Sequence, residues 1–262
     1  MTRRARPISS RLRTRALARG GVFSRRDAID LGHHDMDLHL WVRTGQVLQA
    51  TRGGYYLTPN DGVGWSDLTS PQQQLEHERR RALAVLHVVP ECFAASHDTA
   101  LRLHGLPTVS TPTACADVHL MATAATPTRP RRPGVKTHRM PAGTRTVLRP
   151  ARAVSVADAI AQAGCQGGLI GALIPADAAV ARGDLERAEL DEAIARAAGL
   201  PGSTGLAEVV GLVDGRSESA GSTFWSTVRG QCWSSMVSTS IAVQRSCIGR
   251  RSASSDCTGP GT

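Results

Sequence analysis

Near its N-terminus the chain divides into short runs of polar and apolar residues that are separated by glycines. The first run follows Ser24, whose side chain suits the N-cap of a helix, and it ends before Gly32, a residue that commonly stops one. In the second run Met36, Leu40 and Trp41 recur at helical spacing. This pattern predicts two short helices joined by a glycine turn.

Two apolar runs follow the second helix and predict a β-hairpin. Residues 47–48 and 55–57 flank residues 52–54, whose sequence Arg-Gly-Gly suits a tight turn. Helix, turn, helix and hairpin in this order are typical of a winged helix-turn-helix, which places its second helix in the major groove of DNA. A small domain with the same element order but without DNA contact is the alternative.

Farther along, the pattern predicts a mixed region and then a helical one. The expected elements are helices at residues 72–88 and 97–103, the latter after a short buried strand or turn, strands at 118–121 and 135–138, a helix or helix pair from 154 that Pro175 interrupts, an amphipathic helix between Asp184 and Gly199, and a short helix at 204–213.

These elements predict an α+β fold: a winged helix-turn-helix, a mixed α/β middle region, a helical region and a disordered tail. The expected boundaries are residues 1–16 for a basic disordered arm, 17–60 for the winged helix-turn-helix, 72–150 for the mixed α/β middle domain, 151–215 for the helical region and 222–262 for the tail.

Composition supports contact with nucleic acid. The chain has 31 Lys and Arg against 22 acidic residues and a net charge of +9, and Lys136 is its only lysine. Arginines crowd the start of the chain, at positions 3, 4, 6, 11, 13, 15 and 19. Such an arm could neutralise phosphates or enter a minor groove. A solvated tail and a mitochondrial-type presequence are the alternatives.

No segment has the pattern of a secretory signal or of a membrane span. The N-terminal arginines lack a following hydrophobic region, and the most apolar stretch, residues 167–180, contains Pro175 and Asp177 and is too short to cross a bilayer. The six cysteines form no CxxC pair. We therefore expect a cytoplasmic protein without membrane contact.

Four segments carry a resemblance to a known family: GVFSRRDAIDLG with TGQVLQATRGGYYL, ASHDTALRLHGLP, DVHL followed by RPRRPGVKTHR, and IPADAAVARGDLERAELDEAIARAAGLPG followed by DGRSESAG. Together they resemble actinobacterial proteins with an AbiEi-type antitoxin N-terminal domain. The resemblance implies a transcriptional regulator whose winged helix binds DNA, and a nucleotidyltransferase toxin as a possible partner. A protein-interaction module that binds a toxin through residues 184–198 is an alternative function.

Many such relatives end in a domain similar to very-short-patch repair endonucleases, and here the chain departs from the pattern. Glu218 matches the first acid of that domain's metal site, yet residues 222–262 contain one acid, Asp256, and neither lysine nor histidine. One carboxylate cannot hold and orient a catalytic Mg²⁺. We predict no catalytic residues and no enzyme activity, and we hypothesise that a frameshift near Ser222 replaced the nuclease domain. An inactive nuclease remnant and a genuine low-complexity tail are the alternatives.

Contacts with double-stranded DNA are expected on the second helix and the wing. Asp35, Asp37 and His39 are poor phosphate partners, and the acids would repel phosphate unless they accept hydrogen bonds from cytosine amino groups. Groove contact is assigned to His33, His34, Arg43 and Thr44, and phosphate contact to Arg25, Arg26 and Arg52. A solvated loop is expected for Arg129, Arg131 and Arg132, with a second phosphate contact as the alternative.

Other groups of polar residues are not interpreted as catalytic or metal-binding sites. His33, His34 and the neighbouring acids could hold a metal, but polar side chains on a recognition helix more often face DNA or solvent. Residues 96–98 spell Ser-His-Asp, but a triad is defined in space, and the serine is expected to be an N-cap. His104 and His119 are expected to be packed or surface histidines. We predict no bound metal and no cofactor.

Overall fold

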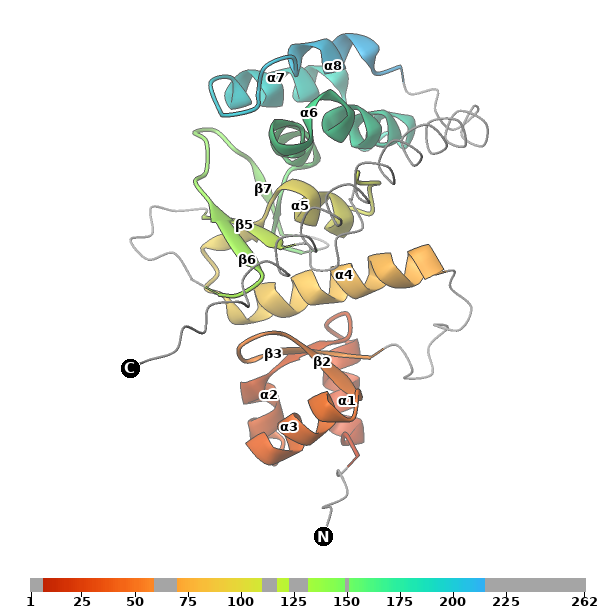
Figure 1. Ribbon diagram of the computed structural model, residues 1–262, viewed down its shortest axis with the longest axis vertical. Helices are drawn as coiled ribbons and strands as arrows, with labels where there is room; N and C mark the ends of the chain where they lie inside the picture. Colours follow the sequence, from red (N-terminus) through yellow and green to blue (C-terminus); the bar gives the residue numbers. More distant parts are fainter. Residues whose placement is uncertain (1–6, 59–69, 110–116, 123–131, 149–150, 215–262) are drawn as a thin grey trace, which may run out of the picture. The chain divides into compact units, whose positions relative to one another are not determined.

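The computed structural model describes residues 7–58, 70–109, 117–122, 132–148 and 151–214 (Figure 1). All of them belong to the first of two units into which the chain divides, and this unit ends at Gly215. The tail at residues 222–262 and Glu218 lie outside the described residues. The fold is α+β, as the sequence pattern predicts.

The first six elements form a winged helix-turn-helix. They are α1 (Ser10–Leu17), β1 (Val22–Ser24), α2 (Arg25–Asp30), α3 (Asp35–Arg43), β2 (Val47–Thr51) and β3 (Gly54–Leu57). The strands form an antiparallel sheet in the order β1-β3-β2. The predicted helix pair and hairpin are confirmed, and β1 is an additional strand that the sequence pattern did not indicate.

Hydrogen bonds at the helix starts explain where α2 and α3 begin. Ser24 Oγ accepts from the backbone N–H of Asp27 at 3.1 Å, and the Asp27 carboxylate accepts from the backbone N–H of Ser24 at 2.8 Å. At α3 the Asp37 carboxylate accepts from the backbone N–H of His34 at 3.0 Å. Both are capping boxes, which satisfy amides that have no partner within the helix.

The prediction of a disordered arm at residues 1–16 is wrong for the part that is described. Residues 10–17 form α1, and its Leu12 and Ala16 are fully buried together with Ile8. Leu12 and Ala16 are four positions apart and share one helix face, and Ile8 precedes the helix and joins the same cluster. Because arginines occupy positions between them, the charge of the segment obscured an amphipathic pattern.

Both faces of the small sheet are covered. Phe23 and Tyr55 pack with the apolar residues of α1 to α3, whereas Val22 and Tyr56 pack against α4 (Ser70–Val88) (Figure 1). Neighbouring residues of a strand point to opposite faces, so the same strands serve two hydrophobic clusters. The winged helix-turn-helix is therefore packed on a helix of the following region. That helix was predicted at residues 72–88.

Gly54 marks how closely α4 approaches the sheet. A Cβ atom added at Gly54 would lie 2.7 Å from the carbonyl oxygen of Ala84. Nearby, Arg80 Nη1 donates a hydrogen bond to the carbonyl oxygen of Leu57 at 3.2 Å. The backbone of β3 therefore lies against α4 at Gly54, and it accepts a hydrogen bond from α4 at Leu57.

A second sheet forms the middle region. Its strands are β4 (Phe93–Ala95), β5 (Val118–Ala122), β6 (Val135–His138), β7 (Thr146–Val147) and β8 (Ala153–Val154), in the order β6-β5-β4-β8-β7. The pairs β5–β6 and β4–β8 are parallel, and the others are antiparallel. The strands predicted at 118–121 and 135–138 are confirmed, as is the helix at 97–103, which is α5 (His97–Leu103).

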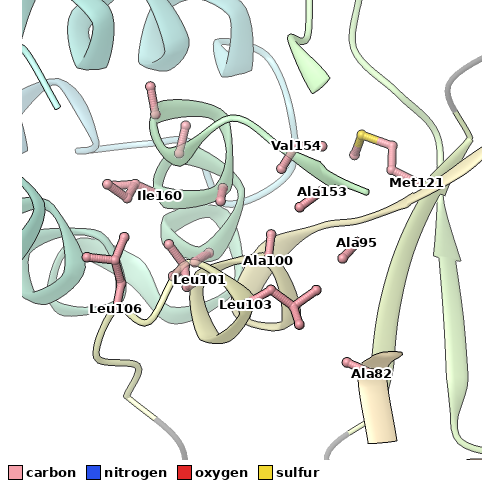
Figure 2. Packing of buried hydrophobic residues seen from close by; sticks show 14 of the residues in the cluster. Ala82, Ala95, Ala100, Leu101, Leu103, Leu106, Met121, Ala153, Val154 and Ile160 are labelled. Atoms are coloured by element: carbon pink, nitrogen blue, oxygen red, sulfur yellow. The ribbon is translucent and has the colours of Figure 1, made fainter. Parts of the chain in front are cut away.

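Small side chains dominate the core beside this sheet. Figure 2 shows Ala100 and Leu101 of α5 in one cluster with Ile160 of α6 (Val156–Ala181) and Val154 of β8. Half of the buried positions in the first half of α6 are alanines. Each buries little area, so the elements must approach closely to form a core in a chain with 3% aromatic residues. The cluster joins the middle and helical regions.

The helical region continues with α7 (Arg187–Ala197) and α8 (Ala207–Leu212). The break predicted at Pro175 lies instead at Gly168, where φ is +66°, and Pro175 sits within the helix. By length and hydropathy α6 is the one helix among the described residues that could cross a membrane. However, 56% of its most apolar window is buried within the protein, as in a core helix.

Candidate nucleic-acid interface

The outer face of α3 carries three exposed side chains in a row, beside the exposed Asp35 at the start of the helix. Met36, His39 and Arg43 are three and four residues apart, and such positions share one face of a helix. Met36 is 58% exposed. On the inner side Leu38 and Trp41 are buried with the apolar residues of α1 and the sheet. We call Met36, His39 and Arg43 the α3 stripe.

This stripe was not predicted from the sequence. Helical spacing grouped Met36 with Leu40 and Trp41, which are buried, and His39 was interpreted as a poor phosphate partner. The signal was present in the spacing, because Met36, His39 and Arg43 recur at helical intervals on a face that excludes Trp41. Choosing between the two faces required knowing that Leu38 packs inward.

An ion pair joins the start of α2 to the start of α3. The Nε and Nη2 atoms of Arg25 each lie 2.6 Å from a carboxylate oxygen of Asp35. The hydrogen bond from Arg25 lowers the pKa of Asp35, so the carboxylate stays ionised and paired. The acid that was expected to repel phosphate therefore has a partner in the protein, and Arg25 is engaged with it.

Three of the predicted DNA contacts, two to phosphate and one to the groove, are exposed arginines on different elements. The Arg26 side chain on α2 is 90% exposed and approaches Asp30 only to 4.0 Å. Arg43 lies in the last turn of α3, and Arg52 lies in the turn between β2 and β3, the wing. His34, the N-cap of α3, is exposed as well. These side chains are accessible to a polyanion.

Two predicted groove contacts bond within the protein. Nε2 of His33 lies 2.8 Å from Ser9 Oγ, and its ring packs edge-on against Trp41 with ring centroids 4.9 Å apart. The hydroxyl of Thr44 donates to the carbonyl oxygen of Leu40 at 2.8 Å at the end of α3. His33 links the turn before α3 to the start of α1, and Thr44 caps the end of α3. Position in the sequence does not distinguish these roles from DNA contact.

The wing has a basic neighbour from the middle region. Arg132 Nη1 donates a hydrogen bond to the carbonyl oxygen of Arg52 at 2.8 Å. This places a guanidinium beside the wing turn, where the sequence analysis expected a solvated loop. Arg129 and Arg131 lie outside the described residues.

A buried carboxylate holds α2 in place. Asp27 accepts hydrogen bonds from Ser24 Oγ at 2.7 Å and from Arg19 Nη1 at 2.8 Å, in addition to the backbone bond in its capping box. Burial raises the pKa of Asp27, but the bonds from Ser24, His87 and Arg19 outweigh burial and hold the pKa well below its usual value. The charge on Asp27 therefore stabilises the fold at neutral pH.

Comparison with known proteins agrees with this geometry. Residues 10–58 match the model of a family described as transcriptional regulators, the AbiEi antitoxins. The match begins at α1 and ends just after β3, so it covers the whole winged helix-turn-helix and nothing beyond it. No curated protein matches the chain. We refer to residues 10–58 as the AbiEi-like domain.

Proposed function

We propose that this chain is a cytoplasmic, DNA-binding transcriptional regulator of the antitoxin kind, whose AbiEi-like domain binds double-stranded DNA. The observation that carries the proposal is the α3 stripe, an exposed face on the second helix of a winged helix-turn-helix. In such modules this helix enters the major groove. The family match is to transcriptional regulators, which supports the same function.

The α3 stripe offers the groove two kinds of contact. Met36 presents an apolar surface that suits a thymine methyl group, and His39 can donate or accept hydrogen bonds at base edges. Arg43 at the end of the stripe, with Arg26 and Arg52, would contact phosphates and set the position of α3. Because Arg25 pairs with Asp35, the charge of the exposed carboxylate at the start of the helix is compensated within the protein.

The test is binding of the full chain to a DNA fragment from its own promoter, measured by fluorescence anisotropy over a range of salt concentrations. Changing Arg26, Arg43 and Arg52 to Ala should lower the slope of log affinity against log salt by about three units, one for each lost phosphate contact. Met36→Ala should weaken binding to the preferred sequence with little change in this slope.

Arg187 of α7 is a matched control, because it is an exposed arginine outside the AbiEi-like domain. Arg43→Ala should lower the affinity and Arg187→Ala should leave it unchanged at the same salt concentration. Equal effects of the two substitutions, or unaltered binding by the triple variant, would exclude this surface.

The antitoxin assignment adds a protein partner to the proposal. A regulator of this family is expected to bind a toxin encoded beside it, and it is expected to act by binding rather than by catalysis. Co-expression with the product of the neighbouring gene, followed by size-exclusion chromatography of untagged proteins, tests for the complex. Separate elution at micromolar concentration would restrict the proposal to DNA binding.

A further inference from the structure

Three histidines that are far apart in the sequence meet at one side of the second sheet. Nitrogen atoms of His97, His119 and His138 all lie within 4.8 Å of one another. Nδ1 of His119 is 3.0 Å from Nε2 of His138, and the ring centroids of His97 and His138 are 4.0 Å apart. His97 is buried and the other two are half-buried. We call these three residues the histidine cluster.

Strand order and register bring the cluster together. In the parallel pair β5–β6, His119 stands opposite Lys136 and Met121 opposite His138. Alternate residues of a strand share a face, so His119 and His138 point to the same side. His97 follows the end of β4, the other neighbour of β5, where the backbone N–H of Ser96 donates to the carbonyl oxygen of His119.

Buried polar groups fix the position of His97. Its Nδ1 lies 3.0 Å from Ser96 Oγ, and its backbone N–H donates to Gln162 Oε1 at 3.3 Å. Ser96 and Gln162 are both buried. His97 is also the one non-glycine residue with positive φ, +52°, among the described parts of the chain. Because Nδ1 contacts Ser96, Nε2 is the ring nitrogen that could serve as a ligand.

The backbone of His119 is also held by a buried polar group, because its N–H donates to Thr99 Oγ1 at 2.9 Å. Gln166 Nε2 lies 3.3 Å from Nδ1 of His119, the nitrogen that faces His138, so a metal bound at Nδ1 would displace this contact. For His97, the contact of Nδ1 with Ser96 matches the hydrogen bond that orients a metal-ligating imidazole through its other nitrogen.

We propose that His97, His119 and His138 bind one divalent transition-metal ion of the zinc class, with water completing its coordination. A set of three imidazole ligands favours such ions over Mg²⁺ or Ca²⁺, which prefer oxygen ligands. Nitrogens in a tetrahedral zinc site lie about 3.3 Å apart, as follows from Zn–N bonds of ~2.0 Å. The pair His119–His138 is already near that spacing.

Such an ion would stabilise the middle region against unfolding. It would tie the start of α5 to β5 and β6, which otherwise meet through hydrogen bonds and a small-residue core. The sequence analysis predicted no metal, because the three histidines belong to separate segments and no ligand spacing is visible along the chain. The proposal does not depend on the function proposed for the AbiEi-like domain.

The test uses the full, untagged chain with Zn²⁺ or Co²⁺ as the probe. After dialysis the protein should retain about one equivalent of zinc by elemental analysis, and zinc at about a hundredfold above its Kd should raise Tm by roughly 5 °C. A chelator should reverse the shift. With Co²⁺ the visible spectrum should show a tetrahedral site without the sulfur charge-transfer band that cysteine ligands give.

His138→Gln should abolish retention of the metal and the rise in Tm, and His119→Gln should do the same. His104→Gln is the matched control, because His104 is a half-buried histidine at the other end of α5 and bonds to the Val154 carbonyl at 2.9 Å. Circular dichroism checks that each variant is folded. Absence of metal binding in the wild type, a sulfur band, or unchanged binding by folded His138→Gln and His119→Gln would overturn the proposal.

Discussion

The Nε2 atom of His87 lies 2.8 Å from a carboxylate oxygen of Asp27 and so joins α4 to α2. Arg19 completes the group, since its Nη1 lies 2.8 Å from the same carboxylate and 3.2 Å from His87 Nε2. Because Asp27 also caps α2, one buried carboxylate links the first helix of the helix-turn-helix to the helix behind the sheet. The packing of the AbiEi-like domain on α4 therefore depends on the charge of the Asp27 carboxylate.

Replacing Asp27 with Ala should lower the free energy of unfolding by about 2–3 kcal/mol, since the change removes a capping interaction and leaves partly buried donors without an acceptor. Urea denaturation measures the loss. Asp30→Ala is the control on the same helix; its exposed carboxylate lies 4.0 Å from Arg26, and its loss should cost less than about 0.5 kcal/mol. Equal losses would mean that Asp27 does not anchor the domain.

The contribution of Asp27 should depend on pH in a defined direction. Its pKa is lower in the folded protein than the value of about 3.9 expected in the unfolded chain. The carboxylate therefore stabilises the fold fully above about pH 5, and this contribution is lost as the pH falls toward the folded pKa. The gap in unfolding free energy between wild type and Asp27→Asn should shrink between roughly pH 5 and pH 2.5. A gap that stays constant would contradict the pairing.

Local signals were enough to predict most of the AbiEi-like domain. Ser24 and the glycines after each helix mark boundaries through backbone chemistry that acts within a few residues. The wrong prediction of a disordered arm at α1 also has a physical cause. Arginines around Leu12 and Ala16 suggested a solvated arm, although these two apolar positions, one turn apart, were sufficient for burial against the sheet.

Contacts between distant segments could not be predicted in the same way. His119 and His138 meet because β5 and β6 are parallel and in a particular register, and no local pattern specifies that register. The contact of Arg132 with the carbonyl of Arg52 likewise depends on how the middle region packs beside the wing. Residue types indicate which side chains could bind a metal or DNA, but only the fold shows which of them lie together in one site.

The Arg25–Asp35 pair should modulate DNA binding without touching DNA. Arg25→Ala would leave the Asp35 carboxylate unpaired at the start of α3, so affinity for promoter DNA should fall by about tenfold at ~0.1 M salt. Asp35→Asn in the same background removes the repulsion and should recover much of that loss. Fluorescence anisotropy of both variants measures the effect. If the double variant binds no better than Arg25→Ala, Arg25 contacts phosphate itself.

The close approach of β3 to α4 predicts that Gly54 tolerates no side chain. In Gly54→Ala the new Cβ would lie 2.7 Å from the carbonyl oxygen of Ala84, so the sheet and α4 must separate, at a cost of about 1–3 kcal/mol in unfolding free energy. Gly211 in α8 is the control, because a Cβ there meets nothing within 4 Å, and Gly211→Ala should be neutral or slightly stabilising. Thermal unfolding compares the two variants. A Gly54→Ala protein as stable as wild type would show that the AbiEi-like domain does not pack on α4 in this way.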